Sequence, residues 1–306
     1  MCGIIGCIGH EERAEDALLT GLSNLEYRGY DSAGIATNDG ELAVTKTEGK
    51  VDDLERLVDD TTDSRIGIGH TRWSTHGPPS DENSHPHTDE TNRIAVVHNG
   101  IIENYQALRD ELQSEGIEFT SDTDSEVVPH LIAKALREHT HRSPQAAFEH
   151  AVDRLEGSYA LAAVVAGHDE IFAIRHDSPL VLGIGDEANY LASDVPAFLE
   201  YTRDVVFLED DQVVALTPDD YAVTDADGMS VDVDVTTVEW SAEQTGKSGY
   251  DHFMHKEIHE QPTALRQCTS GRVDELEGYV GAEELTTESK PERVQFVSCG
   301  TSNHAA

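Results

Sequence analysis

The sequence predicts an α+β protein in which antiparallel sheets are covered by helices. Short apolar segments bounded by Gly, Asp and Asn recur between residues 3 and 217, and this is the pattern of strands. Amphipathic segments lie between some of them, but long crossovers between consecutive strands are few, which favours antiparallel pairing. With 306 residues, the chain is long enough for one large domain or two smaller ones.

Individual segments carry the strand or the helix pattern. Strands are expected at residues 3–8, 33–37, 42–47, 66–71, 94–98, 159–166, 170–175, 180–184, 205–208 and 213–217. Helices are expected at residues 14–25, 102–114, 125–138 and 144–155. Asp124 or Ser125 is a suitable N-cap for the third helix, and Ser143 before Pro144 is a suitable start for the fourth.

The composition changes near residue 240, which indicates a domain boundary. Residues 241–249 (SAEQTGKSG) are polar and contain glycine, as a linker does. We therefore expect one domain at 1–240, a linker at 241–249 and the start of a second domain at 250–306. Residues 293–298 have the strand pattern and run into the small-residue loop 299–302 (CGTS), which normally introduces a βαβ unit. Because the sequence stops four residues later, this α/β domain is expected to be incomplete.

The charge balance is strongly acidic. Asp and Glu number 60 against 21 Lys and Arg, which gives a net charge of −39. The acidic residues are interspersed among the expected strands and helices, so we interpret them as a halophilic surface and not as disorder. The shortage of clustered Lys and Arg argues against a nucleic-acid-binding face.

Membrane, secreted and disulfide-rich proteins are not indicated either. No run approaches the ~20 apolar residues that span a bilayer, and no secretory signal pattern is present, so we expect a cytoplasmic protein. The four cysteines are too few and too scattered for a disulfide framework, and no CxxC pair suggests zinc. They are Cys2, Cys7, Cys268 and Cys299.

Cys2 is the first candidate for chemistry. Initiator methionine is usually removed before a small residue, and removal of Met1 would leave Cys2 with a thiol and a free α-amino group. An α-amino group has a pKa of about 7.7–8.0, near the value of about 8.5 for a free thiol. One residue could then supply both the nucleophile and the general base. Taken alone, Cys2 is more simply interpreted as a small apolar residue that begins a strand.

The segment after the strand at 66–71 is the second candidate. Arg72 lies at the strand end, where its guanidinium can bind a carboxylate through two hydrogen bonds. The simpler interpretation is a surface Arg followed by a core Trp at Trp73. Only the spacing of His85 and His87 suggests metal ligands, so a metal site is disfavoured and none is predicted. The histidines of this region are His70, His76, His85, His87 and His98.

Two further segments offer polar groups. Asn99 and Gly100 follow the strand at 94–98, where the chain is expected to turn sharply. An Asn amide beside a glycine N–H gives two donors that can converge on one oxyanion. Asp124 offers a carboxylate for a substrate ammonium group. The plainer interpretations are an ordinary Asn-Gly turn and a helix cap.

In this order, the segments together resemble the class II glutamine amidotransferases, which have the N-terminal nucleophile hydrolase fold. Residues 25–34 (LEYRGYDSAG), 251–262 (DHFMHKEIHEQP) and 299–305 (CGTSNHA) narrow the resemblance to the glutamine–fructose-6-phosphate aminotransferase family. It covers residues 1–240 as the glutaminase domain and continues into the start of the sugar-isomerase domain. The implied fold is a four-layer αββα sandwich of two antiparallel sheets, followed by the helical start of an α/β domain.

The resemblance implies a role for each candidate residue. Cys2 would attack the glutamine δ-carboxamide and form a thioester, with its own amine moving the proton. Asn99 and Gly100 would hold the oxyanion, Arg72 the α-carboxylate and Asp124 the α-amino group. The remaining implied positions are Thr75, His76 and His85 in the pocket, Trp73 at the passage for ammonia, Arg28 in a mobile segment near the pocket, and Thr301 and Ser302 at the sugar site.

The implied activity is hydrolysis of glutamine to glutamate and ammonia, without a cofactor. Family members also aminate fructose-6-phosphate to glucosamine-6-phosphate for amino-sugar biosynthesis. We expect this chain to use that sugar only with a complete isomerase domain, because the family's lysine near the C-terminus is absent from the sequence. Two alternatives stay open, namely another class II amidotransferase and a non-catalytic remnant. The sequence does not determine the oligomeric state, and a homodimer is one alternative.

Overall fold

The computed structural model of the chain describes residues 2–10, 13–58, 63–138, 143–239, 250, 253–269, 273–274 and 279–280. They belong to two units, Met1–Ser248 and Gly249–Ala306. The expected linker at 241–249, the expected strand at 293–298 and the sugar-site residues Thr301 and Ser302 lie outside the described residues.

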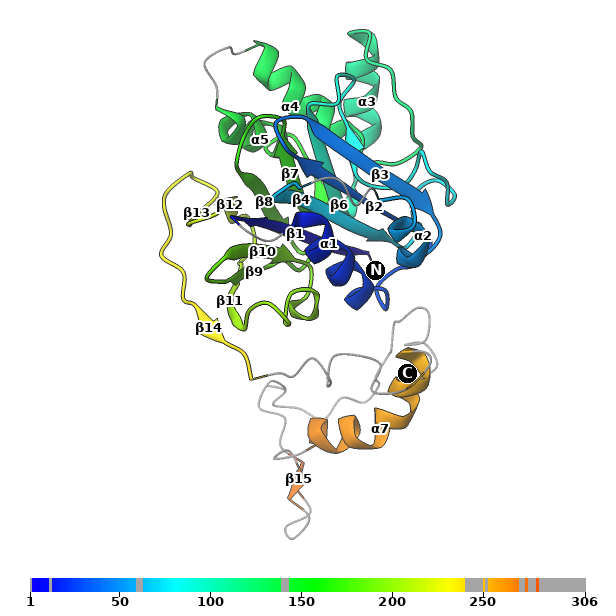
Figure 1. Ribbon diagram of the computed structural model, residues 1–306, viewed down its shortest axis with the longest axis vertical. Coiled ribbons are helices and arrows are strands. Elements are labelled where there is room, and N and C mark those ends of the chain that lie inside the picture. The colour runs from blue at the N-terminus through cyan, green and yellow to red at the C-terminus, as the bar shows by residue number, and fades with distance from the viewer. Residues whose placement is uncertain are drawn as a thin grey trace, which may run out of the picture. The chain divides into compact units, whose positions relative to one another are not determined.

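The first unit contains an eight-stranded antiparallel sheet with the order β14-β11-β9-β10-β1-β4-β2-β3 (Figure 1). Its strands are β1 (Gly3–Gly9), β2 (Ser32–Asn38), β3 (Leu42–Glu48), β4 (Ile66–Arg72), β9 (Val181–Ile184), β10 (Ala188–Ala192), β11 (Asp204–Phe207) and β14 (Thr236–Thr237). β1 lies inside the sheet between β10 and β4, and all seven of its residues are buried. This burial explains why its sequence is apolar without alternation.

A second antiparallel sheet has six strands in the order β13-β12-β8-β7-β6-β5. Its strands are β5 (His87–Thr88), β6 (Ile94–Ile102), β7 (Gly157–Val165), β8 (Ile171–His176), β12 (Val213–Leu216) and β13 (Tyr221–Thr224). β6 and β7 pair along their whole lengths, from Ile94 opposite Val165 to Ile102 opposite Gly157. This continuous register determines where each β6 residue lies, including Asn99.

The two sheets pack face to face, and helices cover their outer faces. Ile4 and Ile8 of β1 belong to the apolar cluster between the sheets, whereas Ile5 and Cys7 pack toward the outer helices. Strand side chains alternate between faces, so β1 contributes to both cores. The outer helices are α1 (Ala14–Asn24), α2 (Val51–Glu55) and the 3-10 helix η1 (Val195–Ala197) on the larger sheet, and α3 (Tyr105–Ser114), α4 (Val127–Glu138) and α5 (Pro144–Val152) on the smaller. These four layers confirm the αββα sandwich (Figure 1).

The end of β6 differs from the expectation. The expected turn at Asn99 and Gly100 is wrong, because β6 continues to Ile102 and stays paired with β7. Gly100 adopts a φ of 131° within the strand, so the glycine permits a local distortion of the ladder without reversing the chain. For the same reason the next helix, α3, begins at Tyr105 and not at residue 102.

The two expected helix starts have different outcomes. The hydroxyl of Ser143 accepts a hydrogen bond from the Ala146 N–H at 3.2 Å, which confirms the cap of α5. α4 begins at Val127, and the side chains of Asp124 and Ser125 bind other groups. Asp124 accepts from the Ile102 N–H, and the Ser125 hydroxyl bonds to the His98 ring. These two side chains connect α4 to β6. Among the described residues, neither side chain has a hydrogen bond to a backbone N–H in the first turn of α4.

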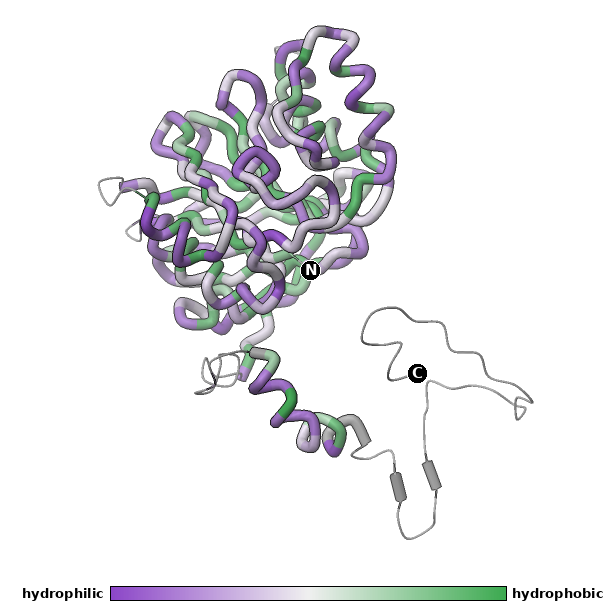
Figure 2. Tube along the Cα trace, turned by 90° about the vertical axis from the view of Figure 1, so that its right-hand side faces the viewer, coloured by the Kyte–Doolittle hydropathy of each residue, from purple (hydrophilic) through white to green (hydrophobic). Residues whose placement is uncertain are grey.

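The described part of the second unit is mainly one helix. α7 (Phe253–Thr269) contains Pro262, and the short strands β15 (Val273–Asp274) and β16 (Tyr279–Val280) pair with each other. Hydrophobic and hydrophilic residues both occur along α7 and along the first unit (Figure 2). Within the residues that the structure describes, no helix combines the length and apolar character needed to cross a bilayer.

Candidate active site

Cys2 lies immediately before β1 and is held by groups from both sheets. The backbone N–H of Trp73 donates to the Cys2 sulfur at 3.2 Å, and the thiol donates to the Trp73 carbonyl at 3.4 Å. The Cys2 carbonyl oxygen accepts from the Arg28 Nε at 2.9 Å and from the Asn99 Nδ2 at 3.1 Å. Trp73 follows β4 of the larger sheet and Asn99 lies on β6 of the smaller, so Cys2 is fixed where the two sheets meet.

The surroundings of Cys2 keep its thiol protonated. Burial raises the pKa of the Cys2 thiol above its ordinary value, and the hydrogen bond from Trp73 and the positive charges of Arg72 and Arg28 oppose this only in part. At neutral pH a thiol with a raised pKa is mostly neutral, and it needs a base before it can act as a nucleophile.

Arg28, predicted to lie near the pocket, contacts the backbone of Cys2. Its side chain is buried and joins the Cys2 carbonyl to Asp194, whose carboxylate lies 3.5 Å from the Arg28 guanidinium. The Tyr27 hydroxyl donates to the same carboxylate at 2.6 Å. Asp194 therefore anchors the segment after α1 beside the candidate nucleophile, and no local sequence pattern indicated it.

Asn99 places an amide donor beside Cys2, and Gly100 follows it on β6. The Asn99 Oδ1 accepts from the His70 Nε2 at 3.1 Å, which leaves the Nδ2 pointing to Cys2. A Cβ atom at Gly100 would overlap the carbonyl oxygen of Ser158, so no other residue fits this backbone. Of the pair predicted to hold an oxyanion, Asn99 is thus brought to Cys2, although both residues lie inside a strand.

Arg72 is buried at the end of β4. Its guanidinium donates to the carbonyl oxygens of His76, Gly77 and Pro78, with distances of 3.1 Å to Gly77 and 3.5 Å to Pro78. Burial lowers the pKa of Arg72, whereas the negative charges of Asp31 and Asp124 raise it. An Arg side chain stays charged in either case, so a fixed positive charge faces these carboxylates.

Asp124 is buried next to the end of β6. One carboxylate oxygen accepts from the Ile102 N–H at 2.8 Å and the other accepts from the Ser125 hydroxyl at 3.2 Å. A carboxylate has about four acceptor positions, so Asp124 retains capacity for an ammonium group.

The remaining predicted pocket residues are Trp73, Thr75, His76 and His85, of which Trp73 contacts Cys2 through its backbone. Trp73 is 45% exposed and packs edge-on against Tyr30, with ring centroids 5.6 Å apart. Thr75 is exposed and His76 is partly exposed beside Tyr105. His85 is buried behind β6, where its Nδ1 accepts from the His98 N–H.

Asp31 and His70 also contact residues of the candidate site, although the sequence pattern does not predict a role for either in binding or catalysis. The Asp31 carboxylate accepts from the Ser74 N–H at 2.8 Å and so holds the segment after Trp73. Asp31 belongs to residues 25–34 (LEYRGYDSAG), which carry the family resemblance, and this is the sequence feature that could have indicated it. The sequence indicates His70 only as one of the histidines of a disfavoured metal site. Among the described residues, no group of three or more His, Cys, Asp and Glu side chains is arranged to hold a metal ion.

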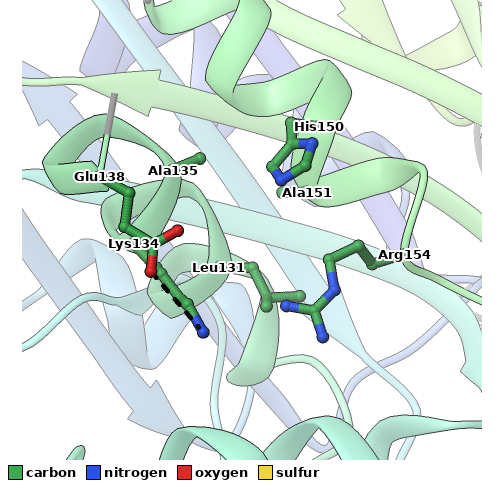
Figure 3. Close-up of a pocket in the computed structure, with 7 residues that line it drawn as sticks. All are labelled: Leu131, Lys134, Ala135, Glu138, His150, Ala151 and Arg154. Carbon is green, nitrogen blue, oxygen red and sulfur yellow. Dashed lines mark ion pairs between the residues drawn. The ribbon is translucent and has the colours of Figure 1, made fainter. Parts of the chain in front are cut away.

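A separate pocket of about 290 Å³ lies between α4 and α5 (Figure 3). It is lined by Leu131, Lys134, Ala135, Glu138, His150, Ala151 and Arg154. Lys134 binds Glu111, at 2.9 Å, and Glu115, and Arg154 binds Glu111 at 2.6 Å, so these two carboxylates compensate both positive charges within the protein. No candidate residue lines this pocket, and it is not the candidate site.

Known proteins share this sequence and fold. A family model described as a glutamine amidotransferase domain matches residues 70–200. The chain is 52% identical over its whole length to a glutamine–fructose-6-phosphate aminotransferase (isomerizing) from Halobacterium salinarum, and 46% identical to one from Thermus thermophilus. In each comparison the chain spans about half the length of the relative, 50% in both cases.

Solved structures agree with the fold. The glutamine phosphoribosylpyrophosphate amidotransferase from B. subtilis superposes with a TM-score of 0.62 and 26% identity, covering 74% of this chain and 49% of that one. A glutamine aminotransferase class-II domain protein from Silicibacter pomeroyi gives a TM-score of 0.53 at 17% identity, covering 76% of this chain and 100% of that one. This chain therefore carries a glutamine amidotransferase domain, matched over residues 70–200, and has the N-terminal nucleophile hydrolase fold.

Proposed function

We propose that this chain hydrolyses glutamine to glutamate and ammonia with Cys2 as the nucleophile. The observation that carries the proposal is the grouping of three residues around Cys2. Asn99, which Gly100 follows on β6, donates to the Cys2 carbonyl oxygen, and Arg72 at the end of β4 interacts electrostatically with both Cys2 and the buried Asp124 carboxylate. These groups match the carboxylate, oxyanion and ammonium that a glutamine substrate presents during hydrolysis.

The proposed reaction has two steps. The Cys2 sulfur attacks the δ-carbonyl carbon while the thiol proton moves to the α-amino group of Cys2, which is free once Met1 is removed. Asn99 and Gly100 hold the oxyanion, and its collapse breaks the C–N bond as the amine returns the proton to the departing ammonia. Water then cleaves the thioester, which releases glutamate and restores the thiol.

A direct test measures both products and the N-terminus. The purified chain is incubated with glutamine, glutamate and ammonia are quantified, and intact mass determines whether Met1 is present. Equal amounts of the two products from protein that begins at Cys2 support the proposal. Activity confined to material that retains Met1 would contradict the role of the α-amine.

Substitution of Arg72 by alanine should weaken recognition of the amino-acid end of glutamine. Loss of a charge-assisted partner should cost ~1.5–3 kcal/mol, measured as kcat/KM for glutamine. The ratio of kcat/KM for glutamine to that for an amide without the α-carboxylate should fall with it. Arg72→Lys is the matched variant, because it keeps the positive charge but cannot form the bidentate hydrogen bonds of a guanidinium. It should retain part of the preference for glutamine over the amide without the α-carboxylate. An unchanged ratio in Arg72→Ala would remove Arg72 from the substrate site.

We further propose that the ammonia serves the amination of fructose-6-phosphate when a complete isomerase domain is supplied. The names of the relatives from H. salinarum and T. thermophilus support this use. In this proposal residues 1–240 are the glutaminase domain, 241–249 the linker and 250–306 the start of the isomerase domain, where Thr301 and Ser302 contact the sugar. Aminosugar formed from glutamine only after addition of an isomerase polypeptide would support the proposal, whereas glutamate alone in both mixtures would contradict it.

The acidic surface is proposed to adapt a cytoplasmic protein to high salt. Acidic side chains line two surface depressions, Asp186, Glu187 and Glu200 in one and Asp16, Asp52 and Glu55 in the other. With a net charge of −39, self-repulsion should weaken as the Debye length falls from ~10 Å at 0.1 M to ~3 Å at 1 M salt.

The thermal midpoint should therefore rise steeply with KCl concentration. Between 0.1 and 3 M KCl we expect an increase of at least about 5 °C, which corresponds to roughly 2 kcal/mol for a domain of this size. Sucrose at equal osmolality is the control, since it does not screen charge and should produce a smaller increase. A midpoint independent of KCl would contradict the adaptation and leave the proposed reaction unaffected.

A further inference from the structure

Histidine side chains take the place of a strand neighbour beside the end of β6. β5 pairs with β6 only at His87 opposite Val96 and Thr88 opposite Ala95. Farther along the same strand, the His98 N–H donates to the His85 Nδ1 at 3.2 Å, and the His98 carbonyl accepts from the His70 Nε2 at 2.9 Å. Both backbone groups of the residue before Asn99 are therefore bound by imidazole rings.

The same ring nitrogen of His70 also contacts the Asn99 side chain. The His70 Nε2 lies 3.1 Å from the Asn99 Oδ1, and the Asn99 Nδ2 lies 3.1 Å from the Cys2 carbonyl oxygen. A rotated amide would place its nitrogen against the His70 donor and its oxygen against the Cys2 carbonyl oxygen. Both contacts would then be repulsive, so His70 and the Cys2 backbone together favour one orientation of the amide.

The contacts of His70 also determine which of its ring nitrogens carries the proton. Both partners of Nε2 are acceptors, so Nε2 carries the hydrogen, and Nδ1 is buried without a hydrogen-bond partner among the described residues. Burial lowers the pKa of His70 to about 3, so the ring is neutral at neutral pH. His85 stacks on it with ring centroids 4.2 Å apart, which restricts rotation of the ring.

We propose that His70 is a positioning residue for glutamine hydrolysis, which orients the Asn99 amide so that its Nδ2 donates to the oxyanion. The inference rests on the proposed function of Cys2 and Asn99. His70 need not touch the substrate or exchange a proton with it. Its role is to keep the oxyanion donor in place before the reaction begins, which is how such a donor lowers the barrier.

Three variants separate positioning from general stability. His70→Leu removes the donor, whereas His70→Gln places an amide N–H where Nε2 stood. His130→Leu is the matched control, because His130 is another buried histidine, on α4, outside the proposed site. We expect His70→Leu to lower kcat for glutamine by about 10- to 100-fold with KM within about twofold, because an oxyanion donor acts mainly in the transition state. His70→Gln should recover kcat to within about threefold of the unmodified chain, and His130→Leu should change the thermal midpoint but not kcat.

Two further measurements distinguish His70 from a base or a purely structural residue. The rate at which iodoacetamide alkylates Cys2, followed on the Cys2 peptide by mass spectrometry, should be unchanged in His70→Leu, because alkylation forms no oxyanion. The ¹⁵N NMR signals of His70, assigned with His70→Gln, should show a neutral ring protonated at Nε2 from pH 5 to 9. This second measurement uses the unmodified chain and stands even if His70→Leu does not fold.

The outcomes are distinguishable. Wild-type kcat in His70→Leu, equal losses in His70→Leu and His70→Gln, slower alkylation of Cys2, or a His70 ring that titrates between pH 5 and 9 would each overturn the positioning role alone. Absence of Cys2-dependent glutamine hydrolysis in the unmodified chain would overturn the proposed function, and this inference with it.

Discussion

Replacement of Cys2 by alanine should abolish glutamine hydrolysis. Without the sulfur no thioester can form, and the oxyanion donors alone cannot replace a covalent step. The fold should be little affected, because Cys2 precedes β1 and its backbone contacts to Arg28 and Asn99 do not involve the side chain. The measurement is glutamate release by the purified variant, together with its thermal midpoint.

Cys7→Ala is the matched control for the loss of a thiol. Cys7 is fully buried on β1 and packs in the apolar cluster beneath α1, away from the Trp73 contacts of Cys2. Removing its sulfur should cost roughly 1 kcal/mol of stability while leaving hydrolysis largely intact. Wild-type activity in Cys2→Ala, or equal losses in the two variants, would refute Cys2 as the nucleophile.

Gly100→Ala should have the second-largest effect, on activity and stability together. Gly100 has a φ of 131°, and a Cβ there would overlap the Ser158 carbonyl oxygen of the paired strand β7. The backbone must move to accept the methyl group, which displaces the Gly100 N–H and the neighbouring Asn99. Loss of an oxyanion donor typically lowers kcat by about 10²–10³-fold, and we expect a loss in this range. Unfolding should become easier by roughly 3 kcal/mol or more, as measured by urea denaturation.

Gly116→Ala separates backbone strain from steric overlap. Gly116 also has positive φ, 93°, but no described atom outside its chain neighbours lies within 4 Å of a Cβ placed there. This variant should lose only about 1–2 kcal/mol of stability and keep full activity. If the two variants behaved alike, the contact between β6 and β7 at Gly100 would not be the constraint that we infer.

Much of the fold was predictable because its strands are short, apolar and clearly bounded. β10 was missed, and its sequence explains why. Asn189 and the alanines of Ala188–Ala192 have little strand propensity, and the segment becomes a strand because it is paired with β1 on one side and β9 on the other. α2, with five residues, is too short to show a helical period.

The residues of the candidate site were likewise predictable only in part from the sequence. Cys2, Arg72 and Asn99 could be predicted because each is a reactive or donor side chain next to the end of a predicted strand. The roles of Asp194 and His70 could not, because they arise from contacts across 166 and 29 residues of sequence, to Arg28 and Asn99. Such contacts depend on which strands become neighbours, and local pattern does not contain that information.

The position of β1 has a consequence for how the site is lost. β1 lies within the larger sheet, contributes to both apolar cores and is buried along its entire length. Amides in such a strand exchange with solvent mainly through unfolding of the whole unit, whereas surface loops open locally at much lower free energy. Because Cys2 directly precedes this strand, we expect the proposed nucleophile to keep its place until the whole unit unfolds. Arg72, which we propose to bind the α-carboxylate, is held by the carbonyl oxygens of His76, Gly77 and Pro78 in the segment after β4. Local opening of that segment would release the Arg72 guanidinium, so we expect binding to fail under conditions in which Cys2 is still in place.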